Sequence, residues 1–466
     1  MESNTPKVTI IMPSLNVVNF ISECIESVIN QTLSDIEILC IDAGSTDGTL
    51  EILRDYESKD NRIKVVVSPM KSYGHQVNMG LDMARGEYVG IVETDDYIEH
   101  NMYEELYQAA IANQADFVKS DFDVFITSNN NQKFLLRYSL KQHMLDMYDD
   151  EVSYNTYTSR IGLVDIYIWN GIYNLSFLKE HHIRLNETPG AAYQDCGFRY
   201  LVAMNVNKGI FLDKSFYRYR RDNVGSSVYS TKCVGWNLGE FMYIRKVMEE
   251  TGINDARRQA FIARETVGVA VGPYSTLRKW HESNEEIKAA QDKFREMIRK
   301  DRENGLLRQE DMLPTLWLEM RLFTEKPDVF EEYISVKAEM EKLYFQNFIN
   351  KMSNCKEIVV FCTGKAASCA LCVMKMNGIN SIKAFCDNNQ EKWGSVFGGY
   401  DVLSPQEAVL KYPNAHFLIA SAKYGVDILK QLKENNIPES NISIYKLILD
   451  PMESTNKIVN SKKGDL

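Results

Sequence analysis

The chain has 466 residues, of which 44% are hydrophobic and 25% are charged, and its formal net charge at pH 7 is −11. This composition is typical of a globular protein with two or three domains, and the acidic balance argues against nucleic acid as the main partner. No apolar run reaches the roughly 18 residues that a membrane-spanning helix needs. Residues 1–7 are polar and lead straight into an apolar run, so we expect a cytoplasmic protein without a signal peptide.

Nine cysteines lie scattered along the chain. Their odd number and wide spacing favour reduced thiols over a disulfide framework. Cys369 and Cys372 form one Cys-x-x-Cys pair, whereas a structural zinc site usually has two such pairs. We therefore expect buried thiols rather than a zinc site.

The first quarter of the chain alternates short apolar runs with segments of helical periodicity. This order predicts an α/β fold with a mainly parallel sheet and helices on both of its faces. The expected strands are residues 8–12, 36–41, 63–67, 88–92 and 117–119, and the expected helices are residues 20–29, 50–56, 76–84 and 102–112. Residues 121–230 are less regular and rich in aromatic side chains.

The second half of the chain has two different patterns. Residues 231–350 carry long, charged, amphipathic stretches, which predict a helical connector. A second and smaller α/β pattern follows, with expected strands at 357–361, 382–385, 416–420 and 442–445 and expected helices at 365–376, 405–410 and 427–435. The polar end of the chain is expected to be loose. The predicted domains are residues 1–230, 231–350 and 351–450, followed by a tail at 451–466.

Two acidic segments directly follow strands of the first predicted sheet. Residues 41–49 read Ile-Asp-Ala-Gly-Ser-Thr-Asp-Gly-Thr, and residues 93–96 read Glu-Thr-Asp-Asp. Carboxylates at the C-terminal ends of parallel strands face the crevice in which open α/β sheets bind ligands. Such a crevice suits a nucleotide diphosphate that is held through a hard divalent cation.

Five further segments complete an ordered set with these two. They are Pro13-Ser14-Leu15-Asn16, Asn78-Met79-Gly80-Leu81, Arg85-Gly86-Glu87-Tyr88, Gln194-Asp195-Cys196-Gly197-Phe198, and Phe216-Tyr217-Arg218-Tyr219-Arg220 with Ser226. Together they resemble family 2 glycosyltransferases with the GT-A fold, over about residues 7–230. The resemblance implies an inverting enzyme that moves a sugar from a nucleotide-sugar donor, expected to be UDP-linked. The acceptor would be a hydroxyl of a cell-surface glycan or its lipid-linked precursor, reached by peripheral contact with the inner face of the membrane.

The resemblance also implies a nucleotide pocket at the strand ends and in the loops that follow them. The candidate nucleotide-binding residues are Pro13, Leu15, Asn16, Asp42, Lys71, Asn78, Glu93, Thr94 and Arg220. Asp42 would accept a hydrogen bond from the base, and Arg220 would clamp the pyrophosphate. The alternative for Asp42 is an Asx turn that opens a Gly-Ser loop, and the alternative for Arg220 is a surface salt bridge.

Residues 93–96 resemble the Asp-x-Asp metal motif of the family, which implies Mn²⁺ or Mg²⁺ as the cofactor. Asp95 and Asp96 are rival metal ligands. The cation would act as a Lewis acid and offset charge on the departing nucleoside diphosphate. Glu93 replaces the usual first aspartate of the motif. A charged turn after a buried strand is the alternative interpretation.

Asp195 is the candidate general base for the proton of the acceptor hydroxyl, and such bases typically contribute ~10² to 10⁴-fold in rate. Gln194 stands where the family usually has glutamate, and a neutral amide there would leave the pKa of Asp195 less raised. The alternative role for Asp195 is the N-cap of a helix over residues 196–204. Aromatic residues that could stack on acceptor sugars, or simply form core, are Trp169, Tyr193 and Phe198.

Three other functions fit parts of the sequence. Ala43 and Gln194 replace usual acids of the family and favour a catalytically inactive nucleotide-sugar-binding protein. Residues 362–367 are similar to a degraded nucleotide-binding turn, and residues 385–389, with 393–394 and 398–402, resemble Rossmann-type domains attached to bacterial polysaccharide-synthesis proteins. A sugar-nucleotide oxidoreductase would act through this domain, although a packing or homo-oligomerisation module is the preferred interpretation. A nucleotidyltransferase would need a Gly-rich loop with Arg or Lys, where this chain has residues 13–16.

Overall fold

The computed structural model describes residues 5–127, 133–140, 147–158, 167–191, 193–223, 233–277, 285–421 and 424–445. The chain forms two compact units, Met1–Phe330 and Glu331–Leu466. The predicted connector, residues 231–350, is divided between them, because its helices up to Phe330 cluster with the first unit. Ser226 and the predicted tail lie outside the described residues.

The first unit begins with four strands that run parallel to one another. Their order in the sheet is β3-β2-β1-β4, and their bounds are β1 Val8–Ser14, β2 Ile36–Asp42, β3 Ile63–Val67 and β4 Tyr88–Ile91. The helices between and after them are α1 Ile21–Ile29, α2 Thr49–Lys59, α3 Tyr73–Met83 and α4 Met102–Asn113. Helix α3 starts before the predicted residue 76 because the hydroxyl of Ser72 accepts a hydrogen bond from the amide of His75 and caps it.

The same sheet continues with strands of mixed direction, in the order β4-β8-β6-β9-β5 with β7 paired to β6. Their bounds are β5 Tyr97–Ile98, β6 Phe117–Thr127, β7 Lys133–Tyr138, β8 Gly171–Asn174 and β9 Gly209–Arg220. Strand β9 is parallel to β6, while β8 is antiparallel to both β4 and β6. Strand β9 is distant in sequence from the parallel strands, yet its last residue, Arg220, contacts Asp96 after β4.

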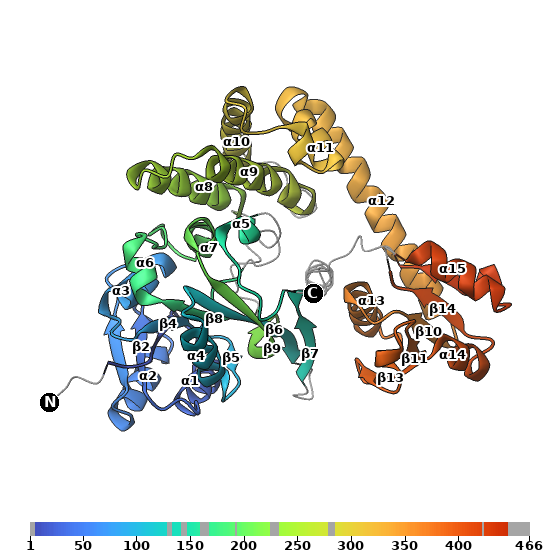
Figure 1. Cartoon of the computed structure of the whole chain (residues 1–466), viewed down its shortest axis with the longest axis horizontal. Coiled ribbons are helices and arrows are strands. Elements are labelled where there is room, and N and C mark those ends of the chain that lie inside the picture. The colour runs from blue at the N-terminus through green and yellow to red at the C-terminus, as the bar shows by residue number, and fades with distance from the viewer. Residues whose placement is uncertain are drawn as a thin grey trace. The chain divides into compact units, whose positions relative to one another are not determined.

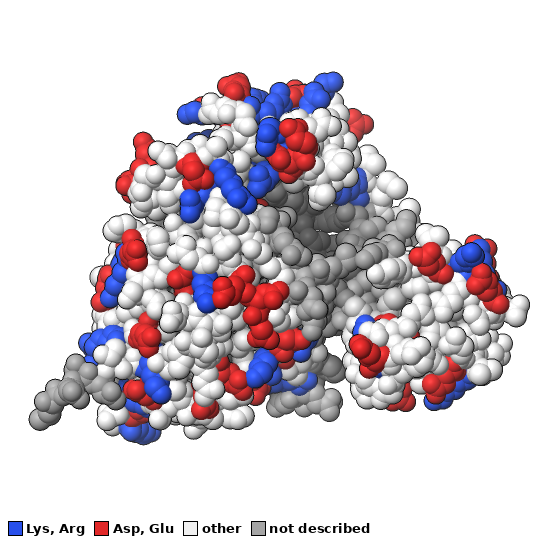
Figure 2. Space-filling model, in the orientation of Figure 1, with Lys and Arg blue, Asp and Glu red and all other residues white. Residues whose placement is uncertain are grey.

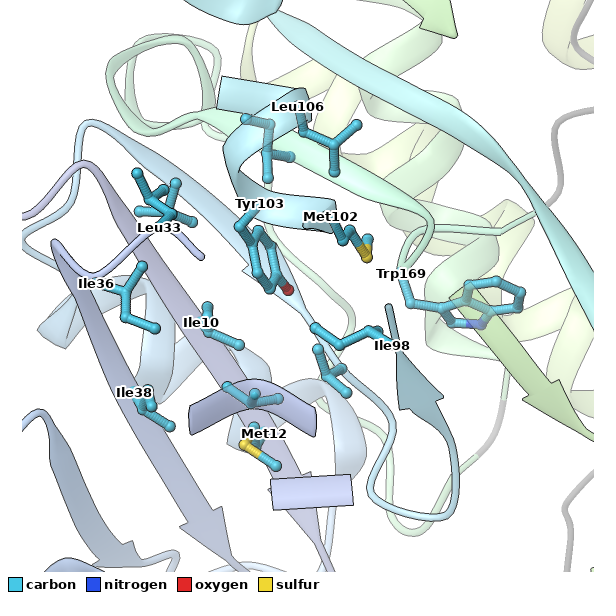
Figure 3. Packing of buried hydrophobic residues seen from close by; sticks show 14 of the residues in the cluster. Ile10, Met12, Leu33, Ile36, Ile38, Ile98, Met102, Tyr103, Leu106 and Trp169 are labelled. Carbon is cyan, nitrogen blue, oxygen red and sulfur yellow. The ribbon is translucent and has the colours of Figure 1, made fainter. Parts of the chain in front are cut away.

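Alternate residues of β1 face opposite sides of the sheet, as the two-residue period of a strand requires. Figure 3 shows Ile10 and Met12 on one side, in the cluster that includes Tyr103 of α4. Ile11 faces the other side, where a Cβ on Gly80 of α3 would lie only 2.6 Å from its side chain. Helices thus cover both faces of the sheet, and the predicted α/β fold is confirmed (Figure 1).

The parallel register brings the acidic segments of the sequence to one edge of the sheet. Ser14 at the end of β1 is paired with Asp42 at the end of β2. On the other side of β1, Ile11 is paired with Ile91, the last residue of β4. Residues 13–16, 42–49 and 93–96 therefore emerge together, at the carboxyl ends of adjacent strands.

The rest of the first unit is mainly helical. Short helices α5 Tyr154–Thr156 and α6 Leu175–Glu180 precede α7 Gln194–Asn205. After β9 come α8 Cys233–Glu250, α9 Ala256–Leu277, α10 Glu285–Glu303 and α11 Pro314–Glu325, with a 3-10 turn at Gln309–Asp311. Helix α8 packs directly on α7, so this helical segment is anchored to the sheet domain.

The second unit is a smaller α/β domain. Its sheet has the strand order β12-β13-β11-β10-β14-β15, formed by β10 Ile358–Phe361, β11 Ile382–Cys386, β12 Val396–Phe397, β13 Tyr400–Leu403, β14 His416–Ile419 and β15 Ile442–Ile444. Its helices are α13 Lys365–Met376, α14 Pro405–Lys411 and α15 Gly425–Glu434, with 3-10 turns at Gln390–Lys392 and Glu439–Asn441. Helix α12, Pro327–Ser353, leads into this unit.

The core of the second unit lies on both faces of its sheet. Val360 belongs to one hydrophobic cluster and Val359 to the other, so the parallel strands are covered on both sides as in Rossmann-like domains. Cys369 and Cys386 are buried within these clusters. The side chain of Cys372 is outside the described residues.

Acidic and basic side chains are interspersed over the face shown in Figure 2. Arg218 of β9 and Asp123 of β6 form an ion pair of 2.9 Å between neighbouring strands. Among the helices that the structure describes, none has the length and apolar character needed to cross a membrane.

Gly90 in β4 lets Tyr103 of α4 pack directly on the sheet, because a Cβ there would lie 2.5 Å from the Tyr103 ring. We expect Gly90→Ala to lower the free energy of unfolding by about 1–3 kcal/mol through overpacking. Gly268→Ala in α9 is the matched control, because open space surrounds its Cβ position. That variant should gain roughly 0.5–1 kcal/mol from helix propensity. Denaturant unfolding of the two variants measures both changes, and equal effects would contradict the packing argument.

Candidate active site

Four polar side chains from three elements come together at the carboxyl edge of the first sheet. Tyr73 begins α3, Glu93 and Asp95 follow β4, and Asp195 lies in the first turn of α7. The hydroxyl of Tyr73 donates a hydrogen bond of 2.5 Å to Oε1 of Glu93. The pKa of Glu93 is raised to about 8, mainly by burial and in smaller part by the charges of Asp95 and Asp195, while the hydrogen bond from Tyr73 opposes the rise. Asp195 likewise contributes to the raised pKa of Tyr73, after burial and Glu93. The structure thus brings Asp195 to the acidic segment, as the sequence predicts.

Asp195 is held at the start of a helix rather than before it. The N-cap residue of α7 is Tyr193, in the left-handed conformation with φ of 63°. The predicted helix over residues 196–204 therefore starts earlier, and Asp195 does not serve as its N-cap. Its carboxylate is half-buried and accepts a 3.1 Å hydrogen bond from the amide of Cys196. Burial raises the pKa of Asp195, while the charge of Arg199, one turn further on, opposes that rise. A helix N-terminus favours an anionic side chain at this point.

Gln194 has a structural role that the sequence does not reveal. Its side chain is buried, and its amide nitrogen lies within 3.0 Å of the carbonyl and hydroxyl oxygens of Thr188 and within 2.9 Å of the carbonyl of Gly190. Gly190 in turn exchanges backbone hydrogen bonds with Lys71 and Tyr73. A glutamate could not donate to these oxygens. The amide therefore supports the loop that holds the start of α3.

Asp95 and Asp96 have different environments. Asp96 is 1% exposed, and its two carboxyl oxygens contact the amide of Arg220 at 2.7 Å and the hydroxyl of Tyr217 at 2.9 Å. Burial, with the neighbouring charge of Asp95, holds the pKa of Asp96 well above its usual range. Asp95 is half-buried, and Oδ2 accepts a 2.7 Å hydrogen bond from Asn223. We therefore assign Asp96 to the structure of the turn and retain Asp95 as the candidate metal ligand.

Arg220 supports this turn instead of standing free for a pyrophosphate. Its Nε donates to the carbonyl of Asp95 at 2.7 Å, and its guanidinium forms an ion pair of 2.6 Å with Glu23. The same group lies over the rings of Phe20 and Phe125, 4.7 and 4.6 Å from their centroids. Arg220 is thus a buried structural cation, and the clamp role predicted for it is not the one that its contacts favour.

Asp42 forms the Asx turn that the sequence leaves open as an alternative. Its side chain is fully buried, and Oδ2 accepts hydrogen bonds from the amides of Gly44 at 2.8 Å and Ser45 at 2.7 Å. Oδ1 contacts the hydroxyls of Ser45 at 2.6 Å and Ser14 at 3.3 Å. A nucleotide base would have to compete with these donors. The contacts of Asp42 therefore hold the loop at residues 44–45, and its direct contact with a nucleotide base stays a prediction.

The remaining candidates at the strand ends divide into loop-shaping and exposed residues. Thr94 donates to the carbonyl of Pro13 at 2.8 Å and joins the ends of β4 and β1. Asn16 has a positive φ of 54°, and its side chain accepts from the amide of Thr46 at 2.9 Å. Leu15 is 36% exposed at this edge, which leaves its side chain available to line a pocket.

Asn78 and Lys71 lie on and before α3. The side-chain amide of Asn78 is buried and bonded to both backbone groups of Leu185 and to the carboxylate of Glu187. This side chain holds the segment that precedes α7, so we remove it from the direct nucleotide contacts. Lys71 is exposed next to this segment, and a diphosphate contact remains a prediction for it.

The aromatic residues predicted near the acceptor are mainly core. Trp169 is 4% exposed and stacks on Tyr217 with ring centroids 4.1 Å apart, and Phe198 is fully buried. Tyr193 is half-buried, and its ring centroid lies 6.0 Å from that of Trp236 in α8. Tyr193, two positions before Asp195, thus pairs with an aromatic side chain of α8. The sequence gives no motif that would identify Trp236.

Residues 9–168 match the model of the family described as Glycosyl transferase family 2. Residues 354–443, within the second unit, match a model described as C2185-like, N-terminal. The N-terminal match includes the strand ends that carry Asp42 and Glu93, whereas Asp195 lies beyond it.

Two curated relatives are similar to this chain over nearly half of its length. The uncharacterized glycosyltransferase EpsJ of Bacillus subtilis (strain 168) is 30% identical over 219 residues, which cover 47% of this chain and 62% of that protein. The glycosyltransferase GlyG of Streptococcus pneumoniae serotype 4 is 27% identical over 222 residues, or 46% of this chain and 70% of that protein. The chain therefore spans under two thirds of the first relative's length.

Solved structures of TarS from S. aureus share the fold. Residues 1–349 of TarS, in complex with UDP-GlcNAc, superpose with a TM-score of 0.54 at 17% identity, covering 72% of this chain and 92% of that one. The sequence match and the shared architecture lead to the same conclusion. The N-terminal domain of this chain is similar to glycosyl transferase family 2 over residues 9–168 and shares the GT-A fold of TarS.

Proposed function

We propose that this chain is an inverting, metal-dependent glycosyltransferase that takes a sugar from a UDP-linked donor. The acceptor in this proposal is a hydroxyl of a cell-surface glycan or its lipid-linked precursor. The observation that carries it is the meeting of Asp195 with Tyr73, Glu93 and Asp95 at the carboxyl edge of the sheet. Support for the nucleotide comes from TarS, which has been crystallised with UDP and with UDP-GlcNAc.

The reaction needs a base on the side of the sugar that faces away from the diphosphate. Asp195 would take the proton of the acceptor hydroxyl while that oxygen attacks the anomeric carbon. The bond from the anomeric carbon to the diphosphate oxygen breaks as the new one forms, so the configuration inverts. A raised pKa suits this task, because a carboxylate of ordinary pKa is a weak base near neutral pH. The hydrogen bond from Tyr73 fixes Glu93, which the proposal places at the ribose.

Asp95 fits a hard divalent cation, since it is half-buried and only Oδ2 has a hydrogen-bond partner among the described residues. Within the described part of the chain, no three His, Cys, Asp or Glu side chains are arranged to hold a metal by themselves. Magnesium often binds through one or two carboxylates together with substrate phosphates, so a single aspartate is consistent with Mn²⁺ or Mg²⁺ arriving with the donor. When bound, the cation would offset negative charge on the leaving diphosphate.

Asp195 is the proposed general base, and its substitution tests this role. Asp195→Asn should lower turnover of a radiolabelled UDP-sugar by about 10² to 10⁴-fold, because the amide cannot take a proton. Binding of UDP should persist, and at 100 times its dissociation constant UDP should stabilise the variant by about 2.7 kcal/mol in a thermal-shift assay. Because burial raises the pKa of Asp195, wild-type activity should fall, on acidification, at a pH above the ~3.9 of an ordinary aspartate. Unchanged turnover in the variant would reject Asp195 as the base.

The two aspartates after β4 should respond differently to the same substitution. Asp96→Ala leaves two buried donors, the amide of Arg220 and the hydroxyl of Tyr217, without their acceptor, which costs about 1–3 kcal/mol for each. Asp95→Ala should change the free energy of unfolding by less than about 1 kcal/mol, since an exposed or half-exposed contact contributes little, yet abolish Mn²⁺-dependent turnover. Denaturant unfolding and a manganese titration of activity separate the two. A stable and manganese-responsive Asp95→Ala enzyme would show that the ligand is elsewhere.

A substitution at Gln194 tests whether a glutamine at this position, where the family usually has glutamate, marks a loss of activity. Gln194→Glu should destabilise the first unit by about 1–3 kcal/mol, because the oxygens of Thr188 and Gly190 lose their donor. The exposed Gln309→Glu is the control, expected within about 0.5 kcal/mol of wild type. An inactive protein that regains turnover with Gln194→Glu, at unchanged stability, would instead favour the binding-protein alternative.

A further inference from the structure

A second carboxyl group lies near Asp195, in a helix outside the residues that match the family model. Glu240 belongs to α8 and is 1% exposed. Its Oε1 accepts a 3.0 Å hydrogen bond from the side-chain amide of Asn186. Its Oε2 lies against Gly197 in the first turn of α7, so closely that a Cβ on Gly197 would be 2.5 Å from it. Oε2 is buried without a hydrogen-bond partner among the described residues. The close approach of α8 to α7 thus depends on a glycine at position 197.

Burial favours the neutral form of the Glu240 side chain near pH 7. Its pKa is raised to about 8, mainly by burial and in smaller part by the charge of Asp195. The contacts with Asn186 and with the backbone of Gly197 oppose that rise. Tyr243 and the thiol of Cys196 also face this carboxyl, and both have raised pKa values to which Glu240 contributes, after burial. A glutamine is therefore a close substitute for Glu240 in both shape and charge.

Glu240 also reaches the other side of the reaction centre through Asn186. The carbonyl oxygen of Asn186 packs on α3, where a Cβ on Gly74 would lie 2.0 Å from it. Gly74 directly follows Tyr73, the residue that holds Glu93 by a hydrogen bond. One buried carboxyl therefore touches both the turn that carries Asp195 and the segment that packs beside Tyr73.

We propose that Glu240 is a positioning residue for Asp195. By joining the first turn of α7 and the loop at Asn186 to α8, it sets where the Asp195 carboxylate stands relative to Tyr73 and Glu93. Glu240 itself does not touch the substrate in this proposal. The inference rests on the proposed function, and it makes the helical segment after the sheet domain a part of the reaction centre.

The experiment compares Glu240→Ala with Glu240→Gln and with Asp301→Ala in the full chain. Asp301 is a matched control, because it is a 4% exposed acid of α10 that pairs with Arg245 of α8 at 2.6 Å. Hydrogen exchange of peptides covering residues 185–205 reports the position of α7, and kcat and KM for a UDP-sugar report the reaction.

The expected result is a specific loss in Glu240→Ala. Exchange over residues 185–205 should speed up, and kcat should fall by about ten- to a hundredfold, as expected for a displaced reacting group. The donor KM should stay within about threefold of wild type, and Glu240→Gln should restore both readouts because it restores the contacts. Asp301→Ala should lower the melting temperature without changing kcat or the exchange of α7. Gly197→Ala should reproduce the Glu240→Ala behaviour by pushing the carboxyl away, and it serves if Glu240→Ala does not fold.

Two outcomes would overturn the inference. One is unchanged exchange over residues 185–205 in both Glu240→Ala and Gly197→Ala. The other is a loss of kcat that Glu240→Gln does not restore or that Asp301→Ala matches. If the wild-type chain transfers no sugar from any UDP-sugar, the proposed function fails, and hydrogen exchange alone then decides whether Glu240 positions α7.

Discussion

Electrostatic repulsion among acids is the constraint on which the edge of the first sheet depends. The fold brings Glu93, Asp95, Asp96 and Asp195 close enough for their charges to affect one another. Such a group is tolerated only if some members keep a proton or gain compensating contacts. Burial and a tyrosine partner do this for Glu93 and for Asp96. What is left is a pair of half-buried acids, Asp95 after β4 and Asp195 in the first turn of α7.

Part of this arrangement can be predicted from the sequence because it depends on local pattern. Apolar runs followed by Asp42 or Glu93 define strand ends, and parallel strands bring those ends to one edge. The partners that decide each acid's role come from far away in the chain. The backbone of Arg220 reaches Asp96 across 124 positions, and Asn78 reaches Leu185 across 107. No periodicity or motif encodes such contacts, so the structural roles of Asp96, Asn78 and Arg220 could not be separated from ligand roles.

The same limit applies to aromatic residues and to helix starts. A dense group of aromatic side chains is consistent with either a surface that stacks on sugars or a hydrophobic core. The burial of Trp169 and its stacking on Tyr217 show that Trp169 belongs to the core. The early start of α3 depends on a single capping hydroxyl, Ser72, which a search for apolar periodicity passes over. Gln194 is an instructive case, because its amide is explained by three oxygens that the sequence does not place next to it.

The glycine at position 197 has a consequence for how the chain can be divided. The family model matches residues 9–168, and the sequence pattern predicts a domain boundary near residue 230, which invites a cut there. A fragment ending there would lack the α8 surface that fills the space over Gly197, and the bare backbone and apolar side chains of α7 would meet water. The first compact unit, which keeps α8 over Gly197, ends at Phe330. Helix α8 covers α7 of the sheet domain, α9 and α10 pack beside α8, and α11 packs beside α9 and α10, so this helical segment is part of the first unit rather than a spacer after it.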